Sequence, residues 1–351
     1  IALTEADRLD DAMAAFERLE KDYPDSQWQS RAQFGRAHIL VIRRQYIGAG
    51  EIYRREAERL LSRERKDELA GIYLEFADRY YEGVPADDPS EAKQADYKQA
   101  LTYYQEAVKL RPTTKLLQKL RFRIARCLEE TDSSSEAIAA YRSFLKDYGR
   151  QDPRSGHSVA GEIEAEARYR LGATELTTGQ PTGARRAWQD LLAWAGDFQG
   201  DRTAPLDEFT AQAEYRIAHT YGLPSPGTIP DLELGVAMAE RFVGSYPDHP
   251  LAPQAELEIA QGFTHHGRHQ SAVDRLEMMI ENPEYENCKQ LPIARRMMGQ
   301  AYFSQQRFDD AIESWSEFLN QYPTDPQWPA VQQKIVNAEY AKAEDARVRK
   351  Q

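Results

Sequence analysis

Two stretches near opposite ends of the chain share one pattern of residue types. The first reads Ala12-Met-Ala-Ala-Phe16-Glu-Arg-Leu19-Glu-Lys-Asp-Tyr23-Pro24, and the second reads Ala311-Ile-Glu-Ser-Trp315-Ser-Glu-Phe318-Leu-Asn-Gln-Tyr322-Pro323. In both, small, aromatic and apolar residues follow one another at spacings of four, three and four, which places them on one face of a helix. The proline then ends the helix, because it disfavours the helical conformation at the residue before it.

The small residue that opens this pattern recurs along nearly the whole chain. The intervals between successive occurrences are 37, 51, 37, 47, 51, 37 and 39 residues. A unit that repeats about every 37 residues, with insertions in some copies, explains these intervals. The eight anchors are Ala12, Ala49, Ala100, Ala137, Ala184, Gly235, Ala272 and Ala311.

A second helix is expected before every anchor from Ala49 onward. These helices span residues 32–42, 69–81, 116–130, 162–176, 210–221, 253–265 and 291–304. Each carries a small residue where the two helices of a hairpin approach most closely, since helix separation depends on the side chains at the contact. These residues are Ala37, Ala77, Ala125, Gly172, Ala218, Ala260 and Gly299. The pattern predicts an all-α fold of helical hairpins.

The repeated unit resembles the tetratricopeptide repeat. Signature positions of that family are occupied by Met298, Gly299, Tyr302, Phe308, Ala311, Trp315 and Pro323. The resemblance implies a right-handed α-solenoid of about seven to eight hairpins. A different helical-hairpin array, such as HEAT repeats, is the alternative.

One continuous solenoid is expected over residues 1–351. It starts with an incomplete repeat at 1–28, so we interpret the chain as a fragment or as one with disordered residues upstream. It ends with a helix at 325–351, a candidate cap, because the end of a solenoid needs a polar outer face. Complete repeats are expected at 29–65, 66–113, 114–150, 159–196, 206–250, 251–284 and 288–324. The segments 83–96, 149–161, 195–207 and 222–231 are expected loops, either tolerated insertions or functional ones.

The composition excludes several classes of protein. The 45 Lys and Arg residues against 57 Asp and Glu residues give a net charge of -12. This balance argues against a general nucleic-acid binder, which needs a basic surface. Two cysteines are too few for disulfides to stabilise a chain of this size, so a disulfide-rich scaffold is excluded. No run approaches the ~18 apolar residues that a membrane-spanning helix needs.

Motifs of catalysis are absent, so no enzyme activity, no cofactor and no metal are predicted. The chain contains no HExxH, no phosphate-binding loop and no GxSxG elbow. The stretch His265-His266-Gly-Arg-His269 is the one dense cluster of metal-ligating side chains. We interpret it as a polar turn between helices, with a metal site as the alternative. Cys127 is expected to be a buried, inert thiol.

In tetratricopeptide folds the first helices of successive hairpins line a concave groove. The position three residues before the closest-approach residue projects into that groove and holds Phe34, Leu74, Phe122, Tyr169, Tyr215, Leu257 and Arg296. Four residues further come His38, Asp78, Arg126, Ala173, His219, Gln261 and Gln300. An aromatic row flanked by polar groups suits partner recognition. The alternative is that the row packs between neighbouring helices.

One basic stretch opposes the acidic total charge. Lys115, Lys119, Arg121, Arg123 and Arg126 lie within twelve residues that contain no acid. Lys119 and Arg126 share a helix face with Phe122, so the hypothesis is a patch that accepts an acidic or carboxylate-bearing peptide. The alternative is a solvated face that pairs with neighbouring acids. The family's carboxylate clamp for chaperone tails needs Lys and Asn at groove positions where this chain lacks them, so that ligand is not expected.

The function expected from these features is a non-catalytic scaffold that binds an extended peptide or a helix of a protein partner. The alternative is a structural self-assembly module or the repeat region of a larger envelope protein. Three helix ends, at Tyr23-Pro24, Tyr246-Pro247 and Tyr322-Pro323, resemble the repeats of a bacterial envelope subgroup that includes the TolA-binding periplasmic protein and the outer-membrane assembly lipoprotein. That resemblance implies the periplasm or cell envelope, with the cytoplasm as the alternative.

Overall fold

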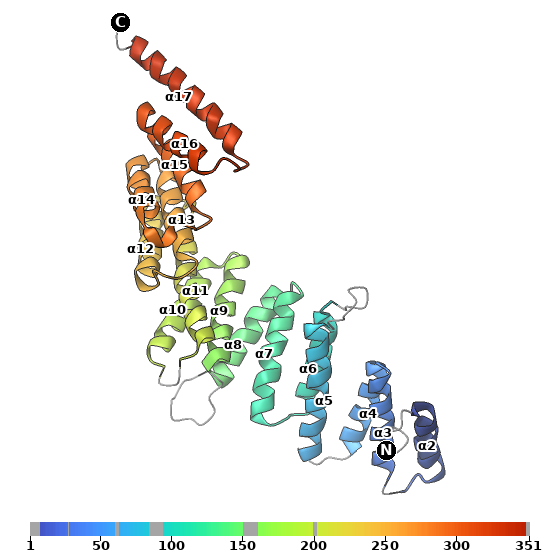
Figure 1. The fold of residues 1–351 in the computed structure, drawn as a ribbon. Helices are drawn as coiled ribbons and strands as arrows, with labels where there is room; N and C mark the ends of the chain where they lie inside the picture. The colour runs from blue at the N-terminus through green and yellow to red at the C-terminus, as the bar shows by residue number, and fades with distance from the viewer. Residues whose placement is uncertain are drawn as a thin grey trace. The chain divides into compact units, whose positions relative to one another are not determined.

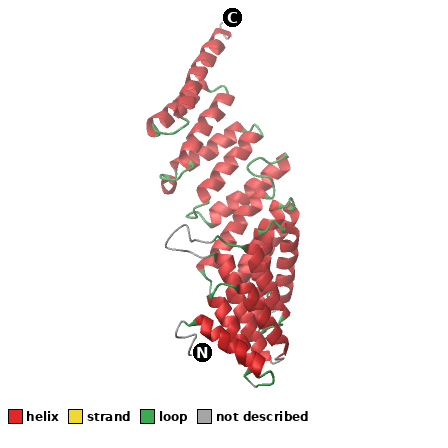
Figure 2. Ribbon diagram, turned by 90° about the vertical axis from the view of Figure 1, so that its right-hand side faces the viewer, coloured by secondary structure: helices red, strands yellow, loops and turns green. Residues whose placement is uncertain are grey.

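The computed structural model describes residues 8–26, 28–59, 63–83, 94–149, 161–198 and 202–348. Within these ranges the chain forms helices and connecting loops and no strand, as Figure 2 shows. Most of the loops predicted at 83–96 and 149–161 lies outside the described residues, as do residues 199–201 of the loop predicted at 195–207. The bounds of that third loop were too wide, because residues 195–196 and 204–207 are helical. None of the described helices combines the length and the apolar character needed to cross a membrane.

The chain divides into two compact units, residues 1–167 and 168–351. Figure 1 labels the helices in chain order. The first unit contains α2 (Leu9–Asp22), α3 (Gln29–Ile42), α4 (Tyr46–Arg59), α5 (Arg63–Glu82), α6 (Tyr97–Lys109), α7 (Thr114–Glu130), α8 (Ser134–Tyr148) and the start of α9 (Gly161–Thr177).

The second unit contains the rest of α9, and seven pairs of consecutive helices follow it along the chain. It contains α10 (Pro181–Gly196), α11 (Ala204–His219), α12 (Ile229–Ser245), α13 (Ala252–His265), α14 (His269–Glu281), η1 (Pro283–Tyr285), α15 (Leu291–Ser304), α16 (Phe308–Gln321) and α17 (Trp328–Val348).

Helices that follow one another in the chain pack together within each unit. In the first unit this holds from α2 to α8, and in the second from α10 to α17. In the first unit α5 also contacts α7, so the first helices of two successive hairpins lie side by side. The predicted all-α fold of stacked helical hairpins is confirmed. The individual repeat boundaries and the capping role of the last helix stay predictions.

All eight anchor residues are buried. The seven alanines are at most 2% exposed, and Gly235 is buried as well. The closest-approach residues are buried too, from Ala37 to Gly299. The repeated small residues therefore mark the contact faces of the hairpins, as their spacing predicts.

The same kind of tryptophan–glycine contact occurs in two hairpins of the second unit. The indole of Trp188 in α10 lies where a side chain at Gly172 in α9 would begin, and the indole of Trp315 in α16 lies in the same way against Gly299 in α15. A Cβ at Gly299 would stand 2.4 Å from the indole Nε1 of Trp315. Only a glycine therefore leaves room for the ring at this distance from the facing helix.

The loop from residue 222 to 228 is part of the core of the second unit. Leu223 is 4% exposed and packs in a cluster with Leu232, Val236 and Ile259. Its side chain fills the space beside Gly235 and Gly262, where added Cβ atoms would meet it at 3.0 and 2.8 Å. This part of the predicted 222–231 loop is packed against the helices, so it anchors the hairpin that it interrupts.

We expect Gly299→Ala to destabilise the second unit by about 1–3 kcal/mol, because the new methyl group overpacks a rigid indole. Gly244→Ala is the matched control, since Gly244 lies in α12 with nothing within 4 Å of an added Cβ. The control should be neutral or stabilising by up to about 1 kcal/mol, because alanine favours helix. Chemical denaturation measures both, and equal stability of the two variants would contradict this packing.

Candidate functional site

A hollow of about 340 Å³ opens between α3, α4 and α5 in the first unit. Its lining includes Val41 and Ile42 of α3, Tyr46 and Tyr53 of α4, and Ile72 and Phe76 of α5. Charged and polar groups stand around it, from His38, Arg44, Glu75 and Arg79. Of the predicted groove residues, His38 lines this hollow and is exposed, whereas Phe34 is half-buried and stacks on Tyr53 with ring centroids 5.7 Å apart.

Asp78 joins α5 to α6 and α7 through one carboxylate. The Tyr104 hydroxyl donates to its Oδ1 at 2.6 Å, and the Lys119 ammonium donates to its Oδ2 at 3.1 Å. The Arg123 guanidinium lies 3.9 Å from Oδ1 and over the ring of Tyr81. Burial and then the hydrogen bond to Asp78 raise the pKa of Tyr104 far above its ordinary value, so this hydroxyl stays protonated.

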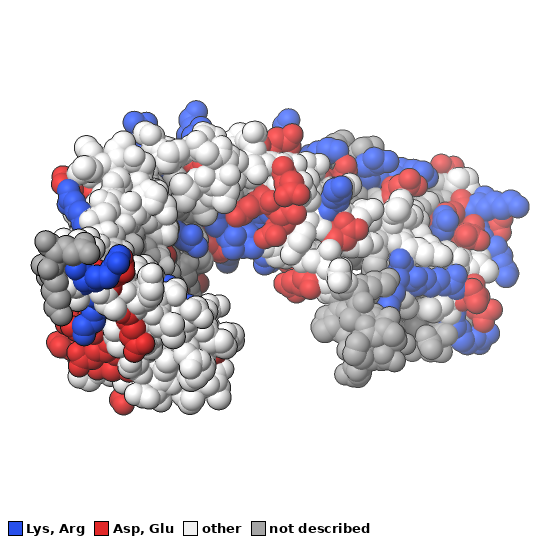
Figure 3. Space-filling view, turned by 90° about the horizontal axis from the view of Figure 1, so that it is seen from above, with Lys and Arg blue, Asp and Glu red and all other residues white. Residues whose placement is uncertain are grey.

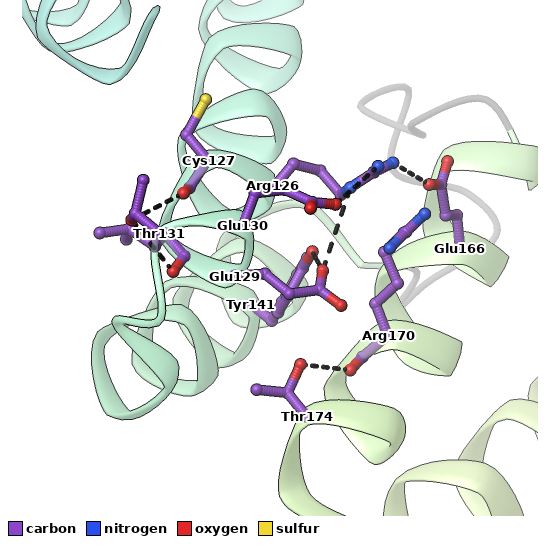
Figure 4. A network of polar contacts seen from close by, with 10 residues as sticks. Arg126, Cys127, Glu129, Glu130, Thr131, Tyr141, Glu166, Arg170 and Thr174 are labelled. Carbon is purple, nitrogen blue, oxygen red and sulfur yellow. Dashed lines mark hydrogen bonds and ion pairs between the residues drawn. The ribbon is translucent and has the colours of Figure 1, made fainter. Parts of the chain in front are cut away.

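Arg126 is surrounded by carboxylates. Its guanidinium lies 2.5 Å from Glu166, 3.7 Å from Glu130 and 3.9 Å from Glu129. Figure 4 shows these side chains meeting, with Glu129 also accepting a hydrogen bond from Tyr141. Arg126 therefore closes a network between α7, α8 and the start of α9.

Four of the five basic side chains in α7 are thus paired with acids of the protein. Lys119 and Arg123 pair with Asp78, Arg121 pairs with Asp147 at 2.7 Å, and Arg126 pairs with three glutamates. The alternative stated above, a face that pairs with neighbouring acids, describes these four side chains. The face of the molecule in Figure 3 shows the same mixing, with basic side chains beside acidic ones.

Two of the predicted groove aromatics lie in the core. Phe122 is 5% exposed and packs against Tyr141 and Phe144, and Tyr215 is 6% exposed and packs against Phe242. Leu257 is also buried, and Leu74 packs half-buried against the first unit's core. At these positions the row packs against neighbouring helices.

In the second unit, Tyr215 and His219 meet Glu258 of α13. The Tyr215 hydroxyl donates to Oε1 of Glu258 at 2.9 Å, Gln254 donates to the same oxygen at 2.9 Å, and His219 Nε2 lies 3.1 Å from Oε2. Burial acts to raise the pKa of Glu258, but the hydrogen bonds from these three side chains and the charge of His219 lower it on balance. The buried carboxylate is thereby held in its ionised form.

Tyr169 lies half-buried between two aromatic rings. Its ring centroid is 6.3 Å from that of Trp188 and 5.5 Å from that of Phe209, and its backbone carbonyl accepts a hydrogen bond from the Trp188 indole at 3.0 Å. Arg296 holds the corresponding place against Trp315, whose indole donates to the Arg296 carbonyl at 3.1 Å.

Gln300 lies one turn after Arg296 and contacts the last helix. Its Oε1 accepts a hydrogen bond from Lys334 of α17 at 2.8 Å. Arg296, Gln300 and Lys334 are all half-buried. The sequence analysis placed α17 as a cap and so missed Lys334, although buried Ala338 lies 39 residues after Gly299 and continues the register of small residues.

The histidine cluster forms a turn that contacts a neighbouring loop, and Cys127 is buried. His266 Nε2 lies 3.0 Å from the Pro226 carbonyl, and Gly267 has a φ of 69°, which suits a tight turn. The search for three or more side chains that could hold a metal ion together finds no such group among the described residues. Burial raises the pKa of the Cys127 thiol to about 12, so it remains protonated and inert.

Glu258→Gln should destabilise the second unit by about 1.5–3 kcal/mol near neutral pH, because charge-assisted hydrogen bonds are lost. Since the folded-state pKa of Glu258 lies below its ordinary 4.5, its stabilisation is complete above that value and disappears as the pH falls through the folded pKa. The stability difference between the parent and the variant should therefore shrink on acidification. Denaturation curves at several pH values measure it, and a constant difference would refute the network's role.

Comparisons with known proteins agree with the repeat pattern. Family models described as tetratricopeptide repeats match residues 89–155 in one case and residues 1–26 and 294–325 in the other. The second model therefore covers both Tyr-Pro stretches with which the sequence analysis opened. Both models describe repeats, and neither describes an enzyme. No curated protein matches the chain.

Several solved structures resemble the chain in fold. The apo form of RapI aligns with a TM-score of 0.53 and 10% identity, covering 86% of this chain and 78% of RapI. A MamA structure aligns at 0.42 and 16% identity, covering 60% of this chain and 94% of MamA. TPR-like repeats of a putative kinesin light chain from Podosopora anserina align at 0.41 and 16%, covering 64% and 98%. The family models match parts of the chain as tetratricopeptide repeats, the likeness to RapI is one of fold, and none of these matches addresses the envelope subgroup.

Proposed function

We propose that the chain is a non-catalytic protein-interaction scaffold that binds an extended peptide or a helix of a partner along the first helices of its hairpins. The observation that carries this proposal is the hollow between α3, α4 and α5. An apolar floor ringed by charged side chains is the usual composition of a site that takes an apolar anchor residue of a partner.

Other polar residues of the first unit are proposed to extend the same binding surface. His38 is exposed, and the Asp78, Lys119 and Arg126 side chains stay partly exposed although they pair with one another or with nearby acids. Fixed ion pairs of this kind present hydrogen-bonding groups in defined positions, which favours specificity over raw affinity. In the second unit, Tyr169, His219, Arg296 and Gln300 are proposed to contribute in the same way.

Substitution of Ile42 tests this proposal. Ile42→Asp places a charge in the hollow at a side chain that is 45% exposed, so the fold should persist. Loss of an apolar anchor contact should weaken partner capture by about tenfold or more. Ile47→Asp is the matched control, since Ile47 is 67% exposed on α4 and does not line this hollow.

Quantitative affinity capture from the native cell compares the three proteins, with circular dichroism to confirm equal helicity. A partner that the parent and the control retain and the Ile42 variant loses is the expected result. Equal capture by all three would overturn the proposed binding face.

Self-association is the second candidate, favoured by α17. This helix leaves Val336 and Tyr340, one turn apart, 52% and 73% exposed. Light scattering over a concentration series separates the two candidates, because only self-association raises the mass with concentration. The Tyr-Pro helix ends are the basis for proposing a cell-envelope location, which fractionation of the native cell tests.

A further inference from the structure

We propose that a second hollow in the first unit binds a free α-amino acid with an apolar side chain. This second hollow has a volume of about 330 Å³ and lies between α4, α5 and α6. It shares no lining residue with the hollow between α3, α4 and α5. The inference therefore goes beyond the proposed partner binding and does not depend on it.

The floor of the second hollow is the backbone of Gly50 beside two tyrosine rings. The Tyr73 hydroxyl donates to the Gly50 carbonyl at 2.6 Å, and the ring centroids of Tyr73 and Tyr103 lie 6.2 Å apart. The two tyrosines are 2% and 6% exposed. Packing therefore holds both rings in place before a ligand arrives, so little ordering remains to oppose binding.

Gly50 leaves a space that the packing of the helices does not require. A Cβ at this position would meet the rings of Tyr73 and Tyr103 at 3.4 and 3.7 Å, which are ordinary van der Waals distances. At Gly172 and Gly299, by contrast, an added Cβ would collide with an indole. Glycine within a helix is less favourable than alanine, and an occupant that needs the space at Gly50 accounts for its presence there.

Two opposite charges on α4 line the second hollow without partners. Glu51 and Arg54 are exposed, and neither has an ion-pair or hydrogen-bond partner among the described residues. Residues three apart lie on one face of a helix, with about 5–6 Å between their Cβ atoms. The ammonium and the carboxylate of an α-amino acid are attached to one carbon atom. A single molecule can therefore pair its ammonium with Glu51 and its carboxylate with Arg54, through charge-assisted hydrogen bonds.

The remaining polar groups of the lining fit a ligand with no net charge. Glu106 of α6 is already paired with Lys109 at 2.6 Å, so one negative and one positive charge are left to the ligand. Burial raises the pKa of Tyr103 to about 12, so its hydroxyl stays protonated. That buried hydroxyl has no hydrogen-bond partner in the part of the chain that the structure describes. A ligand oxygen that reaches it gains a bond that the protein does not supply.

The lining also favours an apolar ligand side chain. Ile47 is 67% exposed and lines the second hollow one turn before Glu51, beside the tyrosine rings of the floor. Apolar surface with a few fixed polar groups is the usual composition of a small-molecule site, and such sites range over about 300–1,000 Å³. The second hollow lies at the lower end of that range, as a small ligand requires.

Isothermal titration calorimetry of the purified chain tests the site. The probes are L-leucine and L-phenylalanine, followed by the N-acetyl and the amide forms of the one that binds more tightly. We expect the free amino acid to bind with a Kd of about 1 mM or below. Each blocked form should bind about tenfold or more weakly, because it lacks one of the two charges.

Three variants of α4 locate the site. Gly50→Ala should weaken binding about tenfold or more because its methyl group fills the floor, while its denaturation midpoint stays equal or rises, since alanine favours helix. Glu51→Gln and Arg54→Gln should each weaken binding by a similar factor, because each removes one charged partner. The controls on the same helix are Gly48→Ala and Arg55→Gln, which alter residues outside the second hollow and should bind as the parent does.

Absence of binding by both amino acids, or a blocked form that binds as tightly as the free amino acid, would overturn the inference. So would parent-like affinity of any of the three variants, or an equal loss of affinity in the controls. Circular dichroism checks that all the proteins have the same helicity. No partner is present in these titrations, so they are independent of the Ile42 experiment. Failure of the titrations removes the amino-acid site alone, and retention of the partner by Ile42→Asp removes the proposed partner-binding face alone.

Discussion

The close approach of paired helices at small residues is the constraint on which the rest of the structure depends. Buried alanines and glycines recur in both helices of the hairpins, and at Gly172 and Gly299 even one carbon atom more would collide with an indole. Each hairpin therefore buries its stripe against its sequence neighbours, and stability is roughly a sum of such local terms. The faces not used in this packing are free to vary, and this is where the proposed binding residues lie.

Residues at corresponding positions of the first helices differ in burial and in charge. Phe122 and Tyr215 contribute to the core, whereas His38 is exposed and Arg296 is half-buried. Because the same register position carries a buried ring in one hairpin and an arginine in another, the first helices present a different chemistry in each hairpin. The apolar hollow in the first unit is the clearest example.

The structural features that depend on local residue spacing were predictable from the sequence. The anchors, the helices and the Tyr-Pro ends of α2, α12 and α16 follow from residues within one helix or one hairpin. Contacts across larger separations were not predictable. Lys119 finds Asp78 across 41 residues and Arg126 finds Glu166 across 40, and no pattern in α7 reveals these partners. Helical spacing predicts on which face of a helix a side chain lies, but it does not predict how far a neighbouring helix covers that side chain.

Hydrogen–deuterium exchange of the chain with and without its captured partner tests the central claim most directly. The account predicts that binding slows amide exchange in α3, α4 and α5, around the hollow, and in α15, around Arg296 and Gln300, while α6 and α16 change little. Slowed exchange confined to the second helices α6 and α16 would contradict it, because the partner would then bind the opposite faces of the hairpins.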